Sequence, residues 1–195
     1  YNKPTQEGMK IHFGEMTRAT RLPLVLYNIP GRTGVNMLPA TALALAAGFS
    51  NITGIKEASG NLDQVSEIAG GAPKGFAVMS GDDSLTLPMM SVGARGVISV
   101  AANIAPAQVS RMCGLFREGQ TAAAAEMHHR LFPLVKALFV ETNPIPVKYA
   151  ASLLGLCRPE PRLPLTPLAA ARRVDAELAA GRDPGPLAGV PIAVK

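Results

Sequence analysis

The sequence predicts an α/β fold built on a parallel β-sheet. Four short apolar segments alternate with helix-like segments, and they lie at residues 24–28, 52–57, 76–80 and 96–100. Their starts, at 24, 52, 76 and 96, are 28, 24 and 20 residues apart, which is the length of one strand–helix unit. Strands that are apolar almost throughout are typical of parallel sheets that are buried on both faces.

The segments between these strands carry signals for helix starts and stops. Pro39 suits a first helical position and Gly48 a helix stop, while Asn61 is a typical N-cap and Asp83 or Ser84 is a second one. Helices are predicted over residues 7–20, 39–47, 61–69, 84–92 and 105–118.

After Gly119 the alternation ends, and only helices and a tail are predicted: residues 121–140, 146–154 and 167–180 as helices, and the Pro- and Gly-rich residues 182–195 as a loose tail. Alternating strands and helices form either an open doubly wound sheet or a (β/α)8 barrel, and the pattern alone does not choose. Four strands cannot close a barrel. Because the chain begins with Tyr1 and not with methionine, we expect further residues to precede it.

Composition excludes several classes of protein. Of the 195 residues, 48% are apolar and 17% are charged, which is typical of a globular chain. The net charge of +5 is spread along the sequence with few aromatic residues, so no nucleic-acid partner is expected. With no signal sequence and no apolar run of about 20 residues, we expect a cytoplasmic protein with no membrane partner. Cys113 and Cys157 are interpreted as small buried residues of a reducing compartment.

Lys56 is the lysine, of seven, whose position indicates chemistry. It lies at the carboxyl end of an apolar strand, where active-site residues of parallel α/β folds project, and alternation places it on the same face as Gly54. Desolvation there disfavours the ammonium form and leaves free amine for attack on a carbonyl. The alternative is a structural lysine paired with Glu57, although alternation points Glu57 to the opposite face.

Tyr27 and Arg32 are expected at the same end of the sheet. Tyr27 ends the first strand, where a phenol can relay protons; the alternative is a tyrosine with a buried ring and a solvated hydroxyl. The tight turn at residues 30–34 presents the guanidinium of Arg32, which suits a carboxylate, and the alternative is a surface arginine.

Gly81 follows the third strand and allows the backbone to approach a ligand closely. The adjacent Asp82 and Asp83 are interpreted as helix caps and not as metal ligands. His128 and His129 are neighbours on a helix and face different directions, so the sequence predicts no metal site.

Several motifs, taken together and in this order, resemble the dihydrodipicolinate synthase family. They lie at residues 1–4 (YNKP), 26–34 (LYNIPGRTG), 54–60 (GIKEASG), 80–83 (SGDD), 96–100 (GVISV), 143–148 (NPIPVK) and 162–167 (RLPLTP). The resemblance runs from Tyr1 to about residue 180.

The resemblance implies a (β/α)8 barrel with a C-terminal helical extension, usually assembled as a homotetramer. This chain would supply only strands five to eight and the extension. The implied domains are residues 1–118 (second half of the barrel), 119–181 (helical extension) and 182–195 (flexible tail). The first four strand–helix units, with a threonine pair of the proton relay, would be absent from it.

By the same resemblance, the catalytic residues are Lys56, Tyr27 and Tyr1, which are the imine-forming lysine, the proton shuttle and a tyrosine that enters the neighbouring subunit's relay. Arg32 would hold the carboxylate of L-aspartate 4-semialdehyde. Ile98, against the bound pyruvate, and Gly81 would line the site. The implied reaction condenses pyruvate with the semialdehyde in lysine and diaminopimelate biosynthesis, with no metal or organic cofactor beyond the imine on Lys56.

Two other readings remain. One is a sibling aldolase or lyase, of the N-acetylneuraminate lyase or keto-deoxy-sugar aldolase type. These enzymes share the lysine and tyrosine but generally lack the Arg-Thr-Gly of residues 32–34, which favours the synthase. The other is an inactive half-barrel, because an unclosed barrel exposes strand edges and an apolar interior.

Overall fold

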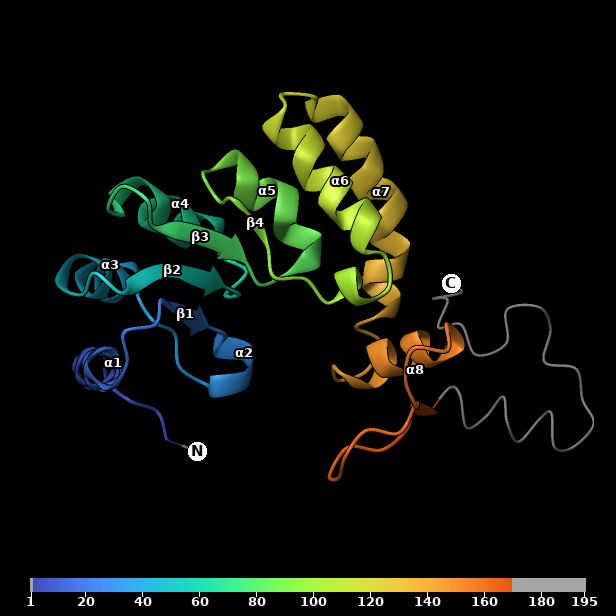
Figure 1. Ribbon diagram of the computed structural model, residues 1–195, viewed down its shortest axis with the longest axis horizontal. Helices are drawn as coiled ribbons and strands as arrows, with labels where there is room; N and C mark the ends of the chain where they lie inside the picture. The colour runs from blue at the N-terminus through green and yellow to red at the C-terminus, as the bar shows by residue number, and fades with distance from the viewer. Residues whose placement is uncertain (1, 170–195) are drawn as a thin grey trace, which may run out of the picture. The chain divides into compact units, whose positions relative to one another are not determined.

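The protein is described from a computed structural model, which defines the structure of residues 2–169 (Figure 1). The chain divides into two compact units, residues 1–99 and residues 100–195. The predicted first domain ended at residue 118, because the helix predicted over residues 105–118 was assigned to the same strand–helix alternation as the fourth strand. In the structure this helix packs along the next helix of the chain, and the compact unit ends before it. The predicted domain boundaries stay a prediction.

The first unit is built on a four-stranded parallel sheet, which confirms the predicted α/β class. Its strands follow each other in chain order: β1 (Leu24–Asn28), β2 (Ile52–Glu57), β3 (Ala77–Ser80) and β4 (Gly96–Val97). The β1–β2 pairing sets Tyr27 opposite Lys56, and the β2–β3 pairing sets Lys56 opposite Met79. Parallel pairing in sequence order brings the carboxyl ends of all four strands to one edge of the sheet.

Helices α3, α4 and α5 pack against β2, β3 and β4. The helical elements of this unit are α1 (Gln6–Ala19), α2 (Pro30–Thr33), α3 (Pro39–Gly48), α4 (Leu62–Gly71), the 3-10 turn η1 (Asp83–Leu85) and α5 (Thr86–Ser91). Figure 1 shows α3 and α4 beside β2 and β3, and α1 packs on α3. The opposite face carries exposed apolar side chains, with Val25 52% and Ile98 44% exposed. The apolar strands predicted a sheet that is buried on both faces. In the described residues only the face that the helices cover is buried.

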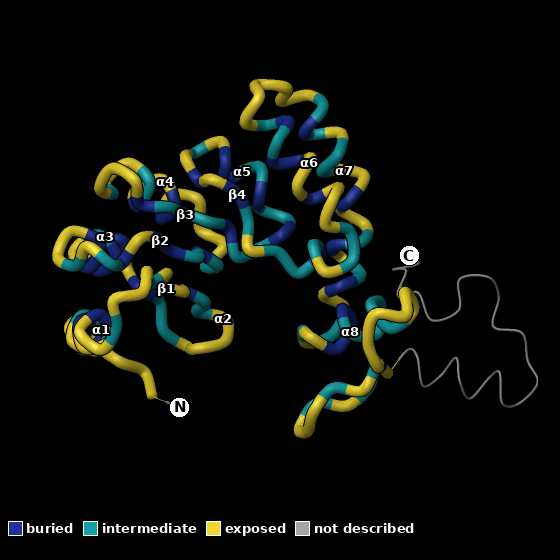
Figure 2. Tube along the Cα trace, in the orientation of Figure 1, coloured by how far each residue is buried: buried dark blue, intermediate teal, exposed yellow. Residues whose placement is uncertain are grey.

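The core of the first unit lies between the sheet and these helices. Leu26 and Ile55 point from the strands toward Leu45 of α3 and Val65 and Ile68 of α4, and all five are almost fully buried. Figure 2 shows the buried positions gathered along β2, β3 and the helix sides that face them. Packing of this kind stabilises the sheet from the helix side only.

The third and fourth strands are shorter than the sequence predicted. β3 begins at Ala77, because Phe76 still closes the preceding turn by donating to Pro73 O. In β4 only Gly96 and Val97 pair as a strand, although the amide of Ile98 still donates to Ser80 O at 2.9 Å. Within the described residues β4 has no strand on its outer side. After the bond from Ile98 to Ser80, the chain therefore makes no further sheet hydrogen bonds with β3.

Of the predicted helix caps, Asn61 is confirmed, whereas neither Asp83 nor Ser84 caps the helical segment after β3, because both lie inside η1 and Asp82 precedes it. The side chain of Asn61 accepts from the amides of Asp63 and Gln64 at 3.0 and 3.1 Å, which confirms it as the N-cap of α4. Asp82 caps η1 by accepting from the amide and hydroxyl of Ser84. The predicted single helix over residues 84–92 is thus a 3-10 turn followed by α5. Gly48 is the last residue of α3 and does not follow it.

The second unit is helical. Its elements are the 3-10 turn η2 (Ala101–Asn103), α6 (Pro106–Arg117), α7 (Thr121–Ala137) and α8 (Ile145–Leu153). α6 packs along α7, and Ile145 packs with Leu168 in a small apolar cluster. Within residues 2–169, no helix combines the length and apolarity that a membrane span needs. The tail at 182–195 and nearly all of the predicted helix 167–180 lie outside the described residues.

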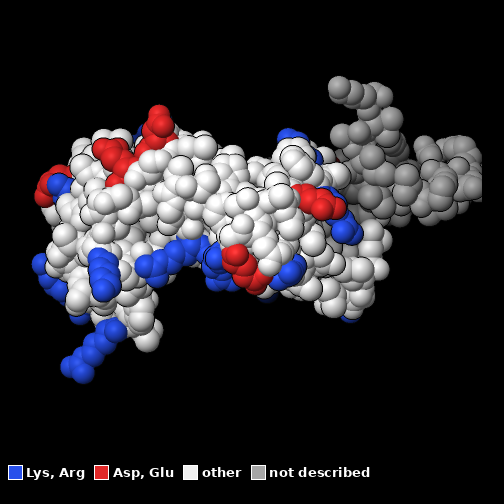
Figure 3. Space-filling view, turned by 90° about the horizontal axis from the view of Figure 1, so that it is seen from above, with Lys and Arg blue, Asp and Glu red and all other residues white. Residues whose placement is uncertain are grey.

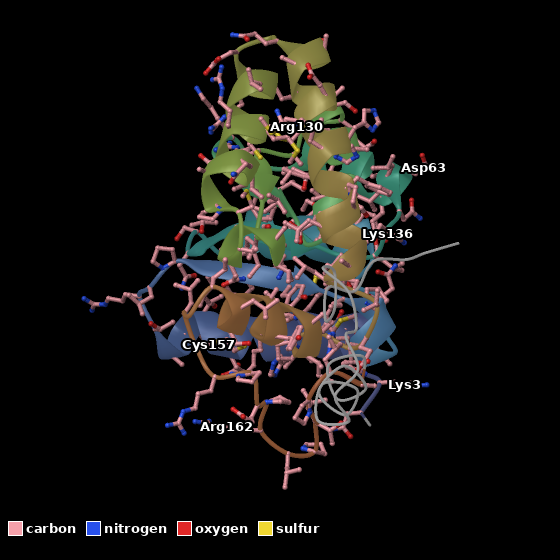
Figure 4. All side chains as sticks on the ribbon, turned by 90° about the vertical axis from the view of Figure 1, so that its right-hand side faces the viewer. Lys3, Asp63, Arg130, Lys136, Cys157 and Arg162 are labelled. Atoms are coloured by element: carbon pink, nitrogen blue, oxygen red, sulfur yellow. The ribbon has the colours of Figure 1, made fainter. Side chains whose placement is uncertain are left out.

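The interpretation of the two cysteines is half confirmed. Cys113 on α6 is buried, as predicted, and neither cysteine forms a disulfide. Cys157 is exposed on the segment that follows α8 (Figure 4), so its predicted burial is wrong. Its sulfur lies 3.7 Å from Lys148 O of α8.

His128 on α7 makes the stability of this unit depend on pH. Its partial burial and the neighbouring His129 lower the pKa of His128 from 6.5. Below pH 6.5 the unfolded chain therefore binds a proton more readily than the folded one, and the free energy of unfolding falls as the pH falls. We expect the thermal midpoint of the His128→Gln protein to depend less on pH between 7 and 5 than that of the wild type. His12→Gln is the control, and equal slopes for the wild type and His128→Gln would contradict the expectation.

Candidate active site

Lys56 and Tyr27 meet at the carboxyl ends of β2 and β1. Their backbones are opposite in the parallel register, and Lys56 Nζ lies over the Tyr27 ring, 4.3 Å from its centroid. Lys56 is partly buried and Tyr27 is 45% exposed. The amine therefore rests on an aromatic face beside open space, a position from which it can reach a small molecule at the sheet edge. The face carries the apolar side chains of Val25 and Ile98 on either side of it.

Glu57 points away from this amine, as strand alternation predicted. Its side chain is only 1% exposed, and no ion pair joins it to Lys56 in the described part of the chain. Its carboxylate accepts from Asn28, Ser59 and Gln64 on the helix side of the sheet. The alternative of a Lys56–Glu57 structural pair is thereby excluded.

Gly81 packs directly on the lysine. A Cβ at this position would lie 3.1 Å from Lys56 Cε and 2.6 Å from Ala58 Cβ, and the Gly81 amide donates to Glu57 O at 2.8 Å. From the sequence we expected Gly81 to let a ligand approach the backbone closely. In the structure its missing side chain makes room for the stem of Lys56 and for the turn after β2. Gly81 therefore shapes the path of the lysine.

Arg32 lies on α2, the single helical turn that directly follows β1. Gly34 closes this turn in the left-handed conformation, with φ 69°, and its amide donates to Pro30 O at 2.8 Å. The Thr33 hydroxyl donates to Ile29 O at 3.1 Å and to Val35 O at 2.9 Å. The turn that the sequence predicted at residues 30–34 is thus a fixed helical turn, and it holds the exposed Arg32 at the edge where Tyr27 and Lys56 lie.

Of the other predicted site residues, Ile98 follows β4 at the same sheet edge, one residue beyond the pair formed by Ser80 and Val97. The next residue, Ser99, donates its hydroxyl to the buried Asp83. Strand topology therefore brings Tyr27, Lys56, Gly81 and Ile98 to one edge of one compact unit. Tyr1 lies outside the described residues.

The sequence analysis did not predict that four polar residues on the helix side of the sheet belong to the site. They are Asn28, Asn36, Glu57 and Gln64. A signal for two of them was present. Asn28 shares a strand face with Leu26, and Glu57 shares one with Ile55, so both occupy core-facing positions. Polar side chains on a core face need partners, which predicts a buried hydrogen-bonded cluster.

The described residues form no cluster of side chains that would hold a metal ion. Within residues 2–169 no group of three His, Cys, Asp or Glu side chains is placed to hold a metal ion. On the face drawn in Figure 3, acidic side chains occur among the basic ones, and most of the surface carries neither charge. The candidate groups at this edge of the sheet are the amine of Lys56, the phenol of Tyr27 and the guanidinium of Arg32.

The fold and this site define a parallel α/β protein with a lysine amine set on a tyrosine ring at the carboxyl edge of its sheet. Comparison with known proteins gives the family. The chain belongs to the dihydrodipicolinate synthetase family, whose model matches residues 1–180.

Curated relatives and solved structures agree with this. Over 165 residues the chain is 53% identical to the 4-hydroxy-tetrahydrodipicolinate synthase of Desulforamulus reducens, a match that covers 85% of this chain and 56% of the relative. The crystal structure of dihydrodipicolinate synthase from Thermotoga maritima matches with a TM-score of 0.85 and 47% identity, over 87% of this chain and 58% of that one. The Acinetobacter baumannii enzyme, crystallised with pyruvate, matches with a TM-score of 0.84 and 42% identity, over 94% and 64%. The chain thus spans little more than half the length of the curated relatives it matches.

Proposed function

We propose that the complete protein is a 4-hydroxy-tetrahydrodipicolinate synthase, a lyase that condenses pyruvate with L-aspartate 4-semialdehyde through an imine on Lys56. The observation that carries the proposal is the position of Lys56 Nζ on the Tyr27 ring, at the carboxyl ends of paired strands. Its support from relatives is the 53% identity to a synthase of that name and the pyruvate bound in the Acinetobacter structure.

We also propose that β1–β4 correspond to strands five to eight of a (β/α)8 barrel, with the second unit as the C-terminal extension. Two observations support this order. The helical unit follows β4 directly, and the exposed apolar face of the sheet, with Val25 and Ile98, is the face that a closed barrel buries. In that arrangement the amine of Lys56 lies inside the mouth of the barrel, where water is scarcer than in the half described here.

The first half of the proposed mechanism is formation of a carbon nucleophile. The Lys56 amine adds to the ketone of pyruvate, and loss of water gives a protonated imine, which withdraws electrons from the neighbouring methyl group. Loss of a methyl proton then leaves an enamine. Tyr27, whose ring lies against the lysine, is the group placed to carry protons to and from these intermediates.

The second half joins the two substrates. The enamine carbon attacks the aldehyde of the semialdehyde and forms the new carbon–carbon bond, while the aldehyde oxygen takes up a proton. The amino group brought in by the semialdehyde then attacks the imine carbon, closes a six-membered ring and releases the Lys56 amine. No step needs an oxidant, and the lysine serves as the electron sink that a metal would otherwise supply.

The proposal is tested by trapping the imine. The complete protein is treated with pyruvate and borohydride, and the reduced adduct is located by mass spectrometry of its peptides. We expect the adduct on Lys56 and not on the exposed Lys74, which lies in the turn between α4 and β3 of the same unit. An adduct on another lysine, or none at all, contradicts the proposed function.

Arg32 separates the synthase from the sibling aldolases. We expect Arg32→Ala to raise the KM for the semialdehyde about 10- to 100-fold, because a charge-assisted contact of about 1.5–3 kcal/mol is lost. The rate of pyruvate imine formation should stay within about twofold of the wild type, since we assign the guanidinium of Arg32 on α2 to the second substrate and not to pyruvate. Steady-state kinetics and borohydride trapping give the two quantities. Arg32→Lys is the matched control for charge without the planar fork, and equal losses in both steps would indicate a structural arginine.

The remaining parts of the proposal concern the assembly. By likeness to its family the complete protein is proposed to be a homotetramer in the cytoplasm, with Tyr1 completing the proton relay of a neighbouring subunit. Sedimentation of the complete protein gives its oligomeric state. A monomer with full activity would remove the role proposed for Tyr1.

A further inference from the structure

We propose that Glu57, Asn28 and Gln64 are positioning residues that hold Lys56 and Tyr27 in place from behind the sheet. The inference deepens the proposed function and rests on it for its catalytic consequence. Its structural part, the placement of the lysine amine, stands on contacts within the first unit alone. None of the three residues faces the open side of the sheet where the substrates would bind.

A buried carboxylate is the centre of this arrangement. Asn28 Nδ2 lies 3.0 Å from Glu57 Oε2 and 3.2 Å from Oε1, Gln64 Nε2 lies 3.0 Å from Oε2, and the Ser59 amide lies 2.7 Å from Oε1. These donors come from β1, from α4 and from the turn that follows β2. One carboxylate on β2 therefore joins β1, α4 and the turn that follows β2.

A second layer orients these donors. Asn36 accepts from Asn28 at 2.7 Å and donates to Gln64 Oε1 at 2.8 Å, and the Met37 amide donates to Asn28 Oδ1 at 3.0 Å. Asn28 and Gln64 are thus each fixed in one amide orientation. Only this orientation presents both of their NH2 groups to the carboxylate of Glu57.

The geometry connects the cluster to the reacting groups. Asn28 is opposite Glu57 in the β1–β2 register, and the preceding pair in the same register is Tyr27 and Lys56. Because successive side chains point to opposite faces, the cluster holds the two strand ends from the helix side while the amine and the ring lie on the open side. Any slip of β1 against β2 at this point would separate Lys56 from Tyr27.

The charge of Glu57 supports a positioning role more than a stabilising one. None of the ion pairs in the described part of the chain includes Glu57, so its carboxylate is held by neutral donors only. A buried charge adds little net stability, because the cost of removing it from water offsets its interactions, although removing it alone would leave its buried donors unpaired. A carboxylate that accepts several bonds, however, fixes the positions of all its donors at once.

The test compares Glu57→Gln, the exchange Glu57→Gln with Gln64→Glu, and the milder Gln64→Met in the complete protein. Glu57→Gln places an amide among donors that it cannot all satisfy. The exchange keeps one carboxylate and one amide in the cluster and gives each NH2 group an acceptor, but it removes the donor that Gln64 Nε2 presents to Met37 O and Asn36 Oδ1, each at 3.3 Å. Val65→Ala, a buried apolar truncation on the same helix, is the control for a general loss of stability.

Two quantities are measured at matched distance below each variant's thermal midpoint. The first is the rate at which acetic anhydride acylates Lys56 relative to the exposed Lys74, read by mass spectrometry, which needs no substrate. The second is the rate of borohydride-trapped imine formation with pyruvate. If the wild type forms no imine, the proposed function fails, while the acylation ratio still decides whether the cluster holds the amine.

We expect Glu57→Gln to move the Lys56 acylation ratio at least about threefold toward that of a freely exposed lysine, and to slow imine formation about 10-fold or more, because small displacements of a reacting group are costly. Gln64→Met should change both in the same direction and by less, and it remains informative if Glu57→Gln does not fold. The exchange should recover part of both losses, because the link between residues 57 and 64 is restored while the bond to Met37 O is not. Glu57→Gln or Gln64→Met behaving like Val65→Ala, or an exchange that recovers nothing, would overturn the proposal.

Discussion

Replacing Lys56 with alanine is expected to lower turnover by at least about 10³-fold, because removing a covalent nucleophile removes the step that the other groups assist. The fold should survive, since Lys56 is only partly buried and makes no ion pair in the described structure. The loss of its contact with the Tyr27 ring should cost no more than about 1 kcal/mol. Steady-state assay of the complete protein and its thermal midpoint give both quantities.

Lys74→Ala is the matched control for loss of one lysine from the same unit, and it should keep turnover near that of the wild type. Exogenous primary amines should restore little of the activity of Lys56→Ala, because an untethered amine lacks the orientation that the strand end supplies. A Lys56→Ala protein that retains more than a few per cent of wild-type turnover would exclude the imine at this position.

Gly81→Ala is expected to have the second largest effect. Its Cβ would lie 2.6 Å from Ala58 Cβ and 3.1 Å from Lys56 Cε, well inside the ordinary contact distance of about 3.5–4.0 Å between carbon atoms. The flexible Lys56 stem can move away from the new methyl group, whereas the shorter contact with Ala58 Cβ is relieved only by a shift of the backbone at Gly81 or Ala58. We expect activity to fall about 10- to 100-fold and stability to fall by about 1–3 kcal/mol.

The control for this prediction is Gly70→Ala on α4. A Cβ there meets no atom within 4 Å, so the substitution should leave activity unchanged and stability equal or slightly higher. Kinetics and chemical denaturation of both variants give the comparison. If Gly81→Ala loses stability but keeps the wild-type rate of imine formation, Gly81 does not control the path of Lys56.

Much of the fold could be predicted from the sequence because local signals agreed with one another. The apolar strands, the Asn61 cap and the helix that begins at Pro39 are all found where the pattern placed them. Strand ends are the exception, and β4 is the clearest case. Its apolar residues continue to Val100, but pairing depends on a neighbouring strand, and the described sheet has none on that side.

The candidate site, too, could be predicted in part from the sequence and in part not. That Lys56 and Tyr27 both end strands is visible in the sequence, and parallel pairing then brings them to one edge. Their contact is a matter of register: β1 is shifted by one residue against β2 near Leu24, and after this shift Tyr27 faces Lys56. A register is set by packing and hydrogen bonds between strands, and neither is written in either strand alone.

The sequence by itself determined the parallel α/β class and the order of the elements, and it singled out the lysine that we propose carries the chemistry. Only the tertiary structure decided that Glu57 joins Asn28 and Gln64 behind that lysine, and that Gly81 makes room for its stem. The physical reason is the distance along the chain over which each kind of interaction acts. Apolar periodicity and capping act between residues a few positions apart, whereas a buried carboxylate chooses its donors among segments that only folding brings together.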